Sequence, residues 1–414
     1  MPCFRTIDPE GGLTGKIAPL QEVFAVQSDP FSPQFLRSFG ITRLGEITGL
    51  DTIGIPVWFA TRPNSRSLSV SQGKGVTDDQ AKISAIMEAV ECAVAEQPRQ
   101  HVTEFATIED MARQQRSVIP FFDLARVNPH QLDPTRQRAW VPGTSLISGE
   151  QRFAPYELVG MDMRSDMPWD RHAFRMTSQG LAAHFSIDKA IEHALLELVE
   201  HDASSVVDTF GLFVNNIREV TDYKGANADL DAILEKVSKA GLDLHIYALP
   251  GRVKLPVIAA VISRQVNGPA GVISRAPAGI ACRTNVAEAI LAALLEAVQS
   301  RLTDIAGARD DLAMDRFQQS KDGVARKQPP LIPLAKLEAE FRPARQSSMG
   351  WQDVLKLMRA AGIEDAYMFP LKSPVPDVHV VRTIVTGLDA HSGSFSEMSM
   401  NSILLTTEVL STAC

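Results

Sequence analysis

The chain carries one eight-residue pattern three times, as Ser84-Ala-Ile-Met-Glu88-Ala-Val-Glu91, His193-Ala-Leu-Leu-Glu197-Leu-Val-Glu200 and Ala292-Ala-Leu-Leu-Glu296-Ala-Val-Gln299. The Ala, Leu, Met and Glu content, without Pro or Gly, predicts that each copy is helical. At 3.6 residues per turn, the fifth and eighth positions lie on one helix face, while the apolar positions between them can pack on a sheet. The pattern therefore predicts three helices that each present two oxygen-bearing side chains together.

The spacing of the copies argues against a simple surface feature. A single Glu-x-x-Glu pair on a helix is usually a solvated face. The copies lie about a hundred residues apart, far longer than the 20–50-residue periods of solenoid repeats. This spacing favours three related α/β units whose helices converge on a shared cleft.

The three copies together offer five carboxylates and one amide. Carboxylates held together without matching Lys or Arg repel one another, so a positive ion should lie among them. Hard cations such as Mg²⁺ take oxygen ligands, usually one or two carboxylates together with phosphate oxygens. We therefore predict a nucleotide–magnesium site with these metal ligands: Glu88, Glu91, Glu197, Glu200 and Glu296.

A short segment of small residues precedes each predicted helix. These segments are Ser71-Gln72-Gly73-Lys74-Gly75, Thr177-Ser178-Gln179-Gly180 and Pro277-Ala278-Gly279. Small residues before a helix leave backbone N–H groups free and let an anion approach closely. The Gly-Lys-Gly turn lacks the spacing of a P-loop, and such turns are common before helices.

Further short blocks stand in order along the chain. They are Gly40-Ile-Thr-Arg43, Thr48-Gly49-Leu50-Asp51, Ile53-Gly54-Ile55-Pro56-Val57, Arg62-Pro63, Glu197-x2-Glu200-x-Asp202-Ala203, Glu296-x2-Gln299-x-Arg301 and Gly307-x-Arg309-Asp310-Asp311. Together with the repeated helices, these blocks resemble the YcaO-domain family over nearly the whole chain.

The resemblance implies a YcaO-like α/β fold of mixed sheets, with three related helix-bearing units around an ATP–Mg²⁺ cleft. It implies that the glutamates bind ATP through Mg²⁺ and that a backbone amide oxygen of a ribosomal precursor peptide is activated by phosphorylation. In the family, attack by Cys, Ser or Thr gives an azoline, external sulfide a thioamide and a terminal amine an amidine. The other expected nucleotide contacts are Lys74, Ser84, Ser178, Gln179, Arg283 and Gln299; no catalytic residue is assigned.

The chain departs from the family pattern at three positions. Cys92 and His201 stand where the family often has Arg after the second acidic residue, and Ala292 stands where it has Arg before the third helix's Glu. An Arg supplies two fixed hydrogen bonds to a phosphate, which neither Ala nor neutral His replaces. The candidates to supply the missing charge are Arg283, Arg301 and Arg275.

Two hypotheses from different classes follow. In the first, the protein is an ATP-dependent peptide-modifying enzyme, similar to a cyclodehydratase or a thioamide synthetase. In the second, it is a catalytically weakened subunit that binds a precursor peptide or scaffolds a partner enzyme. The five glutamates favour the first, whereas Ala292, His201 and the lack of a Pro-rich tail before Cys414 favour the second.

Composition excludes several other classes. A net charge of −8 argues against a nucleic-acid or anionic-membrane surface. The strongest apolar run, residues 255–263, is too short for a bilayer, and the N-terminus lacks the apolar core of a signal peptide. Four cysteines without a C-x-x-C pair are typical of reduced thiols in a cytoplasm. We expect a homodimer or a complex with a TfuA-like, leader-binding or dehydrogenase partner.

The chain is predicted to form one domain over residues 1–414, with subregions 1–150, 151–310, 311–350 and 351–414. The third subregion is predicted to be a mobile loop, because residues 318–349 are rich in Gln, Lys, Pro and Arg. The predicted helices are 78–96, 187–208, 229–240, 286–305 and 352–361. The predicted strands are 52–60, 242–248, 255–263, 367–371 and 378–385. Thr77 with Gln80, and Asn285 with Glu288, have the spacing of capping boxes.

Overall fold

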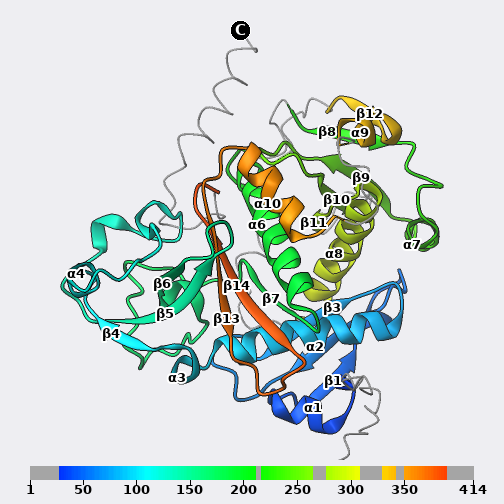
Figure 1. Ribbon diagram of the computed structural model, residues 1–414. Coiled ribbons are helices and arrows are strands. Elements are labelled where there is room, and N and C mark those ends of the chain that lie inside the picture. Colours follow the sequence, from blue (N-terminus) through cyan, green and yellow to red (C-terminus); the bar gives the residue numbers. More distant parts are fainter. Residues whose placement is uncertain (1–27, 211–215, 264–276, 308–328, 342–348, 389–414) are drawn as a thin grey trace, which may run out of the picture.

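The computed structural model describes residues 28–210, 216–263, 277–307, 329–341 and 349–388, and it has an α/β fold (Figure 1). Its strands form three sheets, and each sheet contributes one strand that leads into one of the repeated helices. These units are β3 (Val70–Lys74) with α2 (Asp78–Ala95), β7 (Leu181–His184) with α6 (Ile187–Phe210), and β11 (Ala278–Cys282) with α8 (Val286–Ala306). The predicted fold class is confirmed.

The first sheet has the order β1-β2-β3 and is antiparallel. Its other strands are β1 (Arg43–Glu46) and β2 (Val57–Thr61), preceded by α1 (Pro33–Ser38). Helix α2 begins at the predicted capping box, in which Thr77 accepts from the Gln80 amide and Gln80 accepts from the Thr77 amide. Asn285 likewise caps α8 by accepting from the amides of Ala287 and Glu288.

The six-stranded sheet joins segments that are far apart in the sequence. Its order is β4-β5-β13-β14-β7, and β6 pairs with β5. The strands are β4 (Glu104–Ala106), β5 (Arg138–Ser145), β6 (Gln151–Pro155), β7, β13 (Ala366–Leu371) and β14 (His379–Val385). The short helices α3 (Pro98–His101), α4 (Ile108–Arg113) and α5 (Tyr156–Val159) flank it, while α10 (Trp351–Ala360) packs in one apolar cluster with α6. Because β5 and β6 form one hairpin, the sheet runs across the boundary predicted at residue 150.

The five-stranded sheet has the order β11-β10-β9-β8-β12. Its remaining elements are β8 (Arg218–Thr221), α7 (Ala228–Lys239), β9 (Asp243–Ala248), β10 (Val257–Ser263), β12 (Leu331–Pro333) and α9 (Leu334–Glu340). Helix α7 joins β8 to β9, and β9 pairs antiparallel with both β8 and β10. The connection from β9 to β10 is too short for the crossover that parallel strands require.

Three local predictions need correction. The strand predicted at 52–60 begins only at Val57, because residues 48–50 form a 3₁₀ turn and Gly54 adopts a φ of 69°. Gly73 and Lys74 lie inside β3 rather than in a turn. Within the predicted mobile loop, residues 331–340 form β12 and α9; the loop's remaining residues up to 348 lie mostly outside the described ranges.

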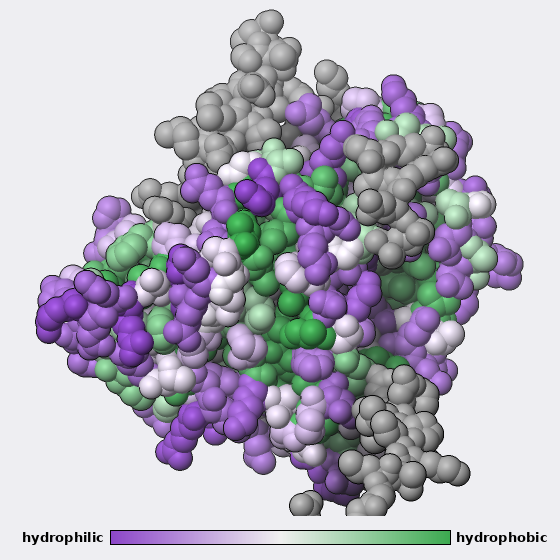
Figure 2. Space-filling model, viewed as in Figure 1, coloured by the Kyte–Doolittle hydropathy of each residue, from purple (hydrophilic) through white to green (hydrophobic). Residues whose placement is uncertain are grey.

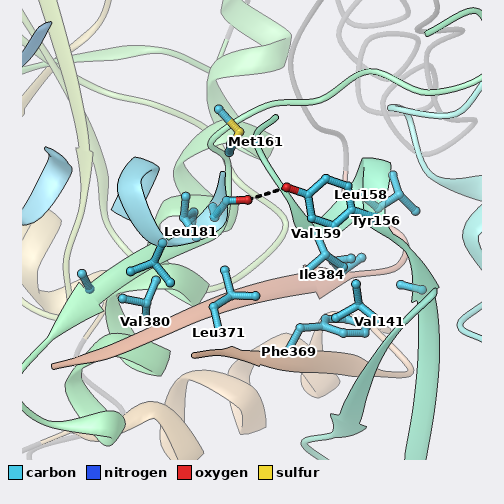
Figure 3. Packing of buried hydrophobic residues seen from close by; sticks show 14 of the residues in the cluster. Val141, Tyr156, Leu158, Val159, Met161, Leu181, Phe369, Leu371, Val380 and Ile384 are labelled. Carbon is cyan, nitrogen blue, oxygen red and sulfur yellow. Dashed lines mark hydrogen bonds between the residues drawn. The ribbon is translucent and has the colours of Figure 1, made fainter. Parts of the chain in front are cut away.

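The core consists of three apolar clusters that lie between the sheets and their helices. In the first cluster, Tyr156 donates its hydroxyl hydrogen to the Ala95 carbonyl at the end of α2, at 2.7 Å (Figure 3). This bond joins α5, which lies beside the six-stranded sheet, to the end of α2 in the first unit. On the face shown in Figure 2, hydrophobic residues gather in the middle and hydrophilic residues surround them.

Candidate functional site

The eighth position of the repeat joins each unit to the next. On α2, Glu91 Oε1 accepts a hydrogen bond from the Ala183 amide in β7, at 2.9 Å. On α6, Glu200 Oε2 accepts from the Cys282 amide in β11, at 3.0 Å. Each acid therefore reaches the strand that precedes the following motif helix.

The third copy closes this ring with an amide in place of an acid. Gln299 Nε2 on α8 donates to the Gln72 carbonyl in β3, at 3.3 Å. The Gln72 side chain in turn accepts from the Thr303 hydroxyl, one turn further along α8. A backbone carbonyl requires a donor, so Gln299 can make this contact and a carboxylate could not. The repeated helices are thus interlocked in a cycle.

The fifth-position acids of the second and third copies lie beside charged partners. Glu197 Oε2 accepts from the Gly180 amide at 3.3 Å, and its other oxygen lies 3.5 Å from His201 Nε2. Glu296 forms an ion pair with Lys74 at 3.2 Å. Glu88 is half-buried on α2. The sequence pattern suggested acids without any cationic neighbour, but Glu197 and Glu296 each have one.

The surroundings of the two eighth-position acids nevertheless disfavour a negative charge on them. Burial, and then the charge of Glu197, raises the pKa of Glu91 well above its usual value, although the bond from Ala183 opposes this. Burial, and then the charge of Glu296, raises the pKa of Glu200 to about 8. A cation among these groups would oppose both shifts, because an opposite charge nearby favours the ionised carboxylate.

The described residues do not form a preassembled metal cage. Within those ranges, no three His, Cys, Asp or Glu side chains converge closely enough to hold a metal ion. Mg²⁺ is usually bound by one or two carboxylates together with waters and phosphate oxygens. The paired acids of neighbouring helices fit that mode, in which the nucleotide completes the coordination, and do not fit a site with five protein ligands.

The other predicted nucleotide contacts are distributed around these helices. Arg283 donates to the Cys282 carbonyl at 2.7 Å, and its charge acts on Glu200, so it lies beside the second pair of acids. Ser84 is half-buried, Gln179 is buried and Ser178 is exposed. The side-chain oxygens of Gln179 and Gln299 are buried without a hydrogen-bond partner, as is the side-chain nitrogen of Gln72.

The three departures from the family pattern have different surroundings. Cys92 is buried, and burial followed by the charge of Glu88 raises the pKa of its thiol to about 12, so it supplies no charge. Burial lowers the pKa of His201, but its hydrogen bond to Glu197 and the nearby acids outweigh this and raise it overall.

Ala292, the third departure, packs half-buried against the second apolar cluster. Arg301 is bound to Asp51 at 2.8 Å, and Arg275 lies outside the described residues.

Sequence reasoning missed two arginines beside the Thr177–Gly180 segment. Arg382 in β14 donates to the Gln179 carbonyl at 2.6 Å, and Arg126 donates to the Thr177 hydroxyl at 3.1 Å. Arg382 is the one charged residue in the apolar stretch 378–385, a signal that could have found it. Arg126 stands in a loop, and its neighbours in the sequence give no comparable signal.

Comparison with known proteins identifies relatives over most of the chain. The family model of the YcaO cyclodehydratases, described as ATP- and Mg²⁺-binding, matches residues 72–389. A protein from the tfuA 3′ region of Rhizobium leguminosarum bv. trifolii is 34% identical over 385 residues, which cover 89% of this chain and 88% of that protein. A Methanothermobacter thermautotrophicus protein is 29% identical over 86% of this chain and 92% of its own length.

Solved structures share the fold at lower identity. YcaO from Methanopyrus kandleri, bound with AMPPCP and Mg²⁺, has a TM-score of 0.63 at 22% identity, covering 86% of this chain and 88% of that one. A chain of the Escherichia coli microcin synthetase McbBCD complex has a TM-score of 0.58 at 13% identity, covering 87% and 89%. At these identities, the likeness concerns the fold alone.

Proposed function

Because the chain belongs to the YcaO family of cyclodehydratases, whose cofactors are ATP and Mg²⁺, we propose that it uses ATP to phosphorylate a backbone amide oxygen of a ribosomal precursor peptide. A nucleophile then adds to the amide carbon, and the phosphorylated oxygen leaves from that carbon as phosphate. With an internal thiol or hydroxyl, peptide and ATP give an azoline, ADP, phosphate and a proton. Sulfide as the nucleophile would give a thioamide, and a terminal amine an amidine.

The chain's own residues hold the reactants in this proposal. Mg²⁺ neutralises phosphate charge and orients the transferred group, as phosphoryl transfer generally requires. Its protein ligands come from the five glutamates of the repeat, one or two at a time. The nucleotide phosphates lie among these residues: Lys74, Ser84, Ser178, Gln179, Arg283 and Gln299. The eighth-position acids are fixed by backbone amides, so they need no reorganisation when the metal binds.

One observation carries the proposal. Glu91 and Glu200 project from successive helices into the next unit, and burial, followed by the charge of nearby acids, raises the pKa of both. A purely structural role would be served as well by Gln, which also accepts a hydrogen bond from an amide. Acids retained at a site that disfavours their charge support a role as ligands of a bound cation.

Calorimetric titration with ATP tests the site directly. Binding should require Mg²⁺, because ATP alone would add negative charge to an acidic cluster. Equal affinity with and without Mg²⁺ would contradict the assignment of these helices.

Isosteric substitution tests the acids individually. Glu88→Gln and Glu197→Gln should leave the melting temperature nearly unchanged and abolish ATP turnover, because the change affects charge and ligation alone. The exposed Glu364→Gln provides a matched control that should behave like the unaltered protein. Wild-type turnover in both site variants would mean that these acids are only a solvated face.

A weakened subunit is the second candidate function, favoured by Ala292 and by the neutral Cys92 thiol. Such a subunit would bind Mg²⁺–ATP and turn it over slowly even with its peptide. We propose that in either case the protein acts with a partner, which the tfuA 3′-region relative suggests is TfuA-like. Co-expression with each neighbouring gene product, followed by mass measurement of the peptide, separates the two functions.

A further inference from the structure

Arg126 and Arg382 are buried, with exposed fractions of 7% and 0%, and neither forms an ion pair within the described part of the chain. The other two buried arginines there have carboxylate partners. These pairs are Arg62–Glu96 at 2.5 Å and Arg138–Asp170 at 2.9 Å. A buried charge without a counter-charge is costly, so the unpaired arginines need an explanation.

The hydrogen bonds of the two arginines go to neutral acceptors. Arg382 donates to the carbonyl oxygens of Val159 and Gln179, at 3.0 and 2.6 Å, while its Nη2 is buried without a partner. Arg126 donates to the Thr177 hydroxyl at 3.1 Å and to a backbone carbonyl at 3.3 Å. The unpaired nitrogen leaves donor capacity for an oxygen that the protein itself does not supply.

The arginines also repel each other. Burial, and then the charge of Arg382, lowers the pKa of Arg126 to about 9. Burial lowers the pKa of Arg382 to about 10, and Glu197 opposes the shift at both residues. Both groups remain charged at neutral pH. Glu197 is already engaged with Gly180 and His201. Glu91 adds to its effect on Arg382 without forming an ion pair, so neither arginine has a carboxylate of its own.

A small pocket gives a ligand access to Arg126, whereas Arg382 lies outside its lining and acts on Arg126 through its charge. Arg126 lines it, together with the apolar side chains of Leu124, Leu198 and Ile384. Guanidinium groups bind tetrahedral oxyanions through two parallel hydrogen bonds, and a phosphate dianion matches two positive charges. The apolar side chains of this wall provide no acceptor that would compete with the anion for the guanidinium N–H groups.

We propose that Arg126 and Arg382 form a subsite for a phosphate group beside the Thr177–Gly180 segment. The assignment of that phosphate to ATP chemistry rests on the proposed function, whereas the affinity for phosphate does not. The group is either the γ-phosphate of the nucleotide or the free phosphate released from the peptide.

Inorganic phosphate tests the subsite without nucleotide. Sodium phosphate should raise the melting temperature of the full-length protein more than sodium chloride at equal ionic strength. Arg126→Gln should weaken phosphate binding about tenfold or more, because it removes a charged donor. Arg138→Gln, which removes a buried arginine that has its own carboxylate, should lower stability and leave phosphate affinity unchanged.

Unchanged phosphate affinity in Arg126→Gln, or no advantage of phosphate over chloride in the wild type, would overturn the subsite. If Arg126→Gln does not fold, Arg126→Lys replaces it. This variant should still weaken phosphate binding severalfold, because lysine cannot donate the two parallel hydrogen bonds of a guanidinium group. Wild-type affinity in that variant would also refute the proposal.

The two sources of phosphate are separated by competition. If the subsite takes the γ-phosphate, AMPPCP with Mg²⁺ displaces phosphate and ADP with Mg²⁺ does not. If it takes the released product at a separate position, phosphate binds together with Mg²⁺–AMPPCP as well as with Mg²⁺–ADP. Specific phosphate binding that persists while ATP fails to bind would uphold the subsite and count against the proposed function.

Discussion

The fifth and eighth positions of the repeat have different surroundings, although the sequence treats them alike. Glu197 and Glu296 lie beside cationic side chains, although Glu197 also accepts a bond from the Gly180 amide. Glu91 and Glu200 accept bonds from backbone amides of the following unit. The first kind of acid can exchange a protein cation for a metal without breaking the fold. The second kind holds neighbouring units together, so its substitution combines structural and functional effects.

Ala292 offers a test of the missing phosphate contact. Ala292→Arg should tighten Mg²⁺–ATP binding by roughly ten- to a hundred-fold, since a charged hydrogen bond to phosphate contributes ~1.5–3 kcal/mol. Ala292→Met, which has a long side chain without charge, is the matched control for packing against the apolar cluster. Calorimetry with each variant measures the difference.

Arg283 provides the complementary experiment. If Arg283 already supplies the missing charge, Arg283→Ala should weaken ATP binding and Ala292→Arg should weaken it too, by repulsion. A gain with Ala292→Arg alone supports a site that lost a contact. No change in either variant would mean that α8 does not face the nucleotide, and the three-helix site would have to be abandoned.

At the scale of elements, glycines set the distance between a strand and its helix. A Cβ at Gly73 would lie 2.0 Å from the Ala85 nitrogen in α2, and one at Gly279 would lie 2.3 Å from the Ala293 oxygen in α8. These glycines therefore permit β3 and β11 to pack directly on helix backbone. The sequence had suggested that they admit an anion, and the structure gives them a packing role.

Substitution of these glycines should destabilise the units that they join. Gly73→Ala and Gly279→Ala should each lower the free energy of unfolding by about 1–3 kcal/mol or more, because the backbones must separate. Gly49→Ala is the control, since a Cβ there would meet nothing within 4 Å. Urea denaturation measures all three, and equal stability among them would refute direct contact.

At the scale of the whole molecule, the interlocked acids make stability depend on pH and on the cation. The pKa of Glu200 rises from an ordinary 4.5 to about 8 in the folded state, so the folded chain retains a proton that the unfolded chain releases. This contribution to stability is complete below about pH 4.5 and is lost as the pH rises through about 8. Glu91 acts in the same direction.

The melting temperature without nucleotide should therefore fall between about pH 5 and pH 8. Glu200→Gln should flatten this dependence, and Mg²⁺–ATP should reduce it in the wild type by stabilising the ionised acids. Glu364→Gln should leave the slope unchanged. An identical slope in Glu200→Gln would show that this carboxyl does not retain its proton in the folded chain.

The remaining property of the whole molecule concerns membranes. Among the described residues, no helix combines the length and the apolar character that a membrane span requires. Cytoplasmic location stays a prediction.

The sequence alone determined the helices and their caps, because periodicity and capping depend on residues within a few positions of one another. The repeated acids, the fold class and the family could be read from local blocks in a fixed order. The direction of the strands could not be read from such blocks. Strands β8, β9 and β10 are antiparallel because of pairings between residues that are distant in the chain.

Only the tertiary structure decided which repeated side chains bind backbone and which face charge. The bonds from Ala183 and Cys282 link residues 92 and 82 positions apart. The pair of Arg126 with Arg382 likewise arises from a loop and a distant strand. Burial and electrostatic environment are properties of packed neighbours, so no local pattern in the chain could specify them.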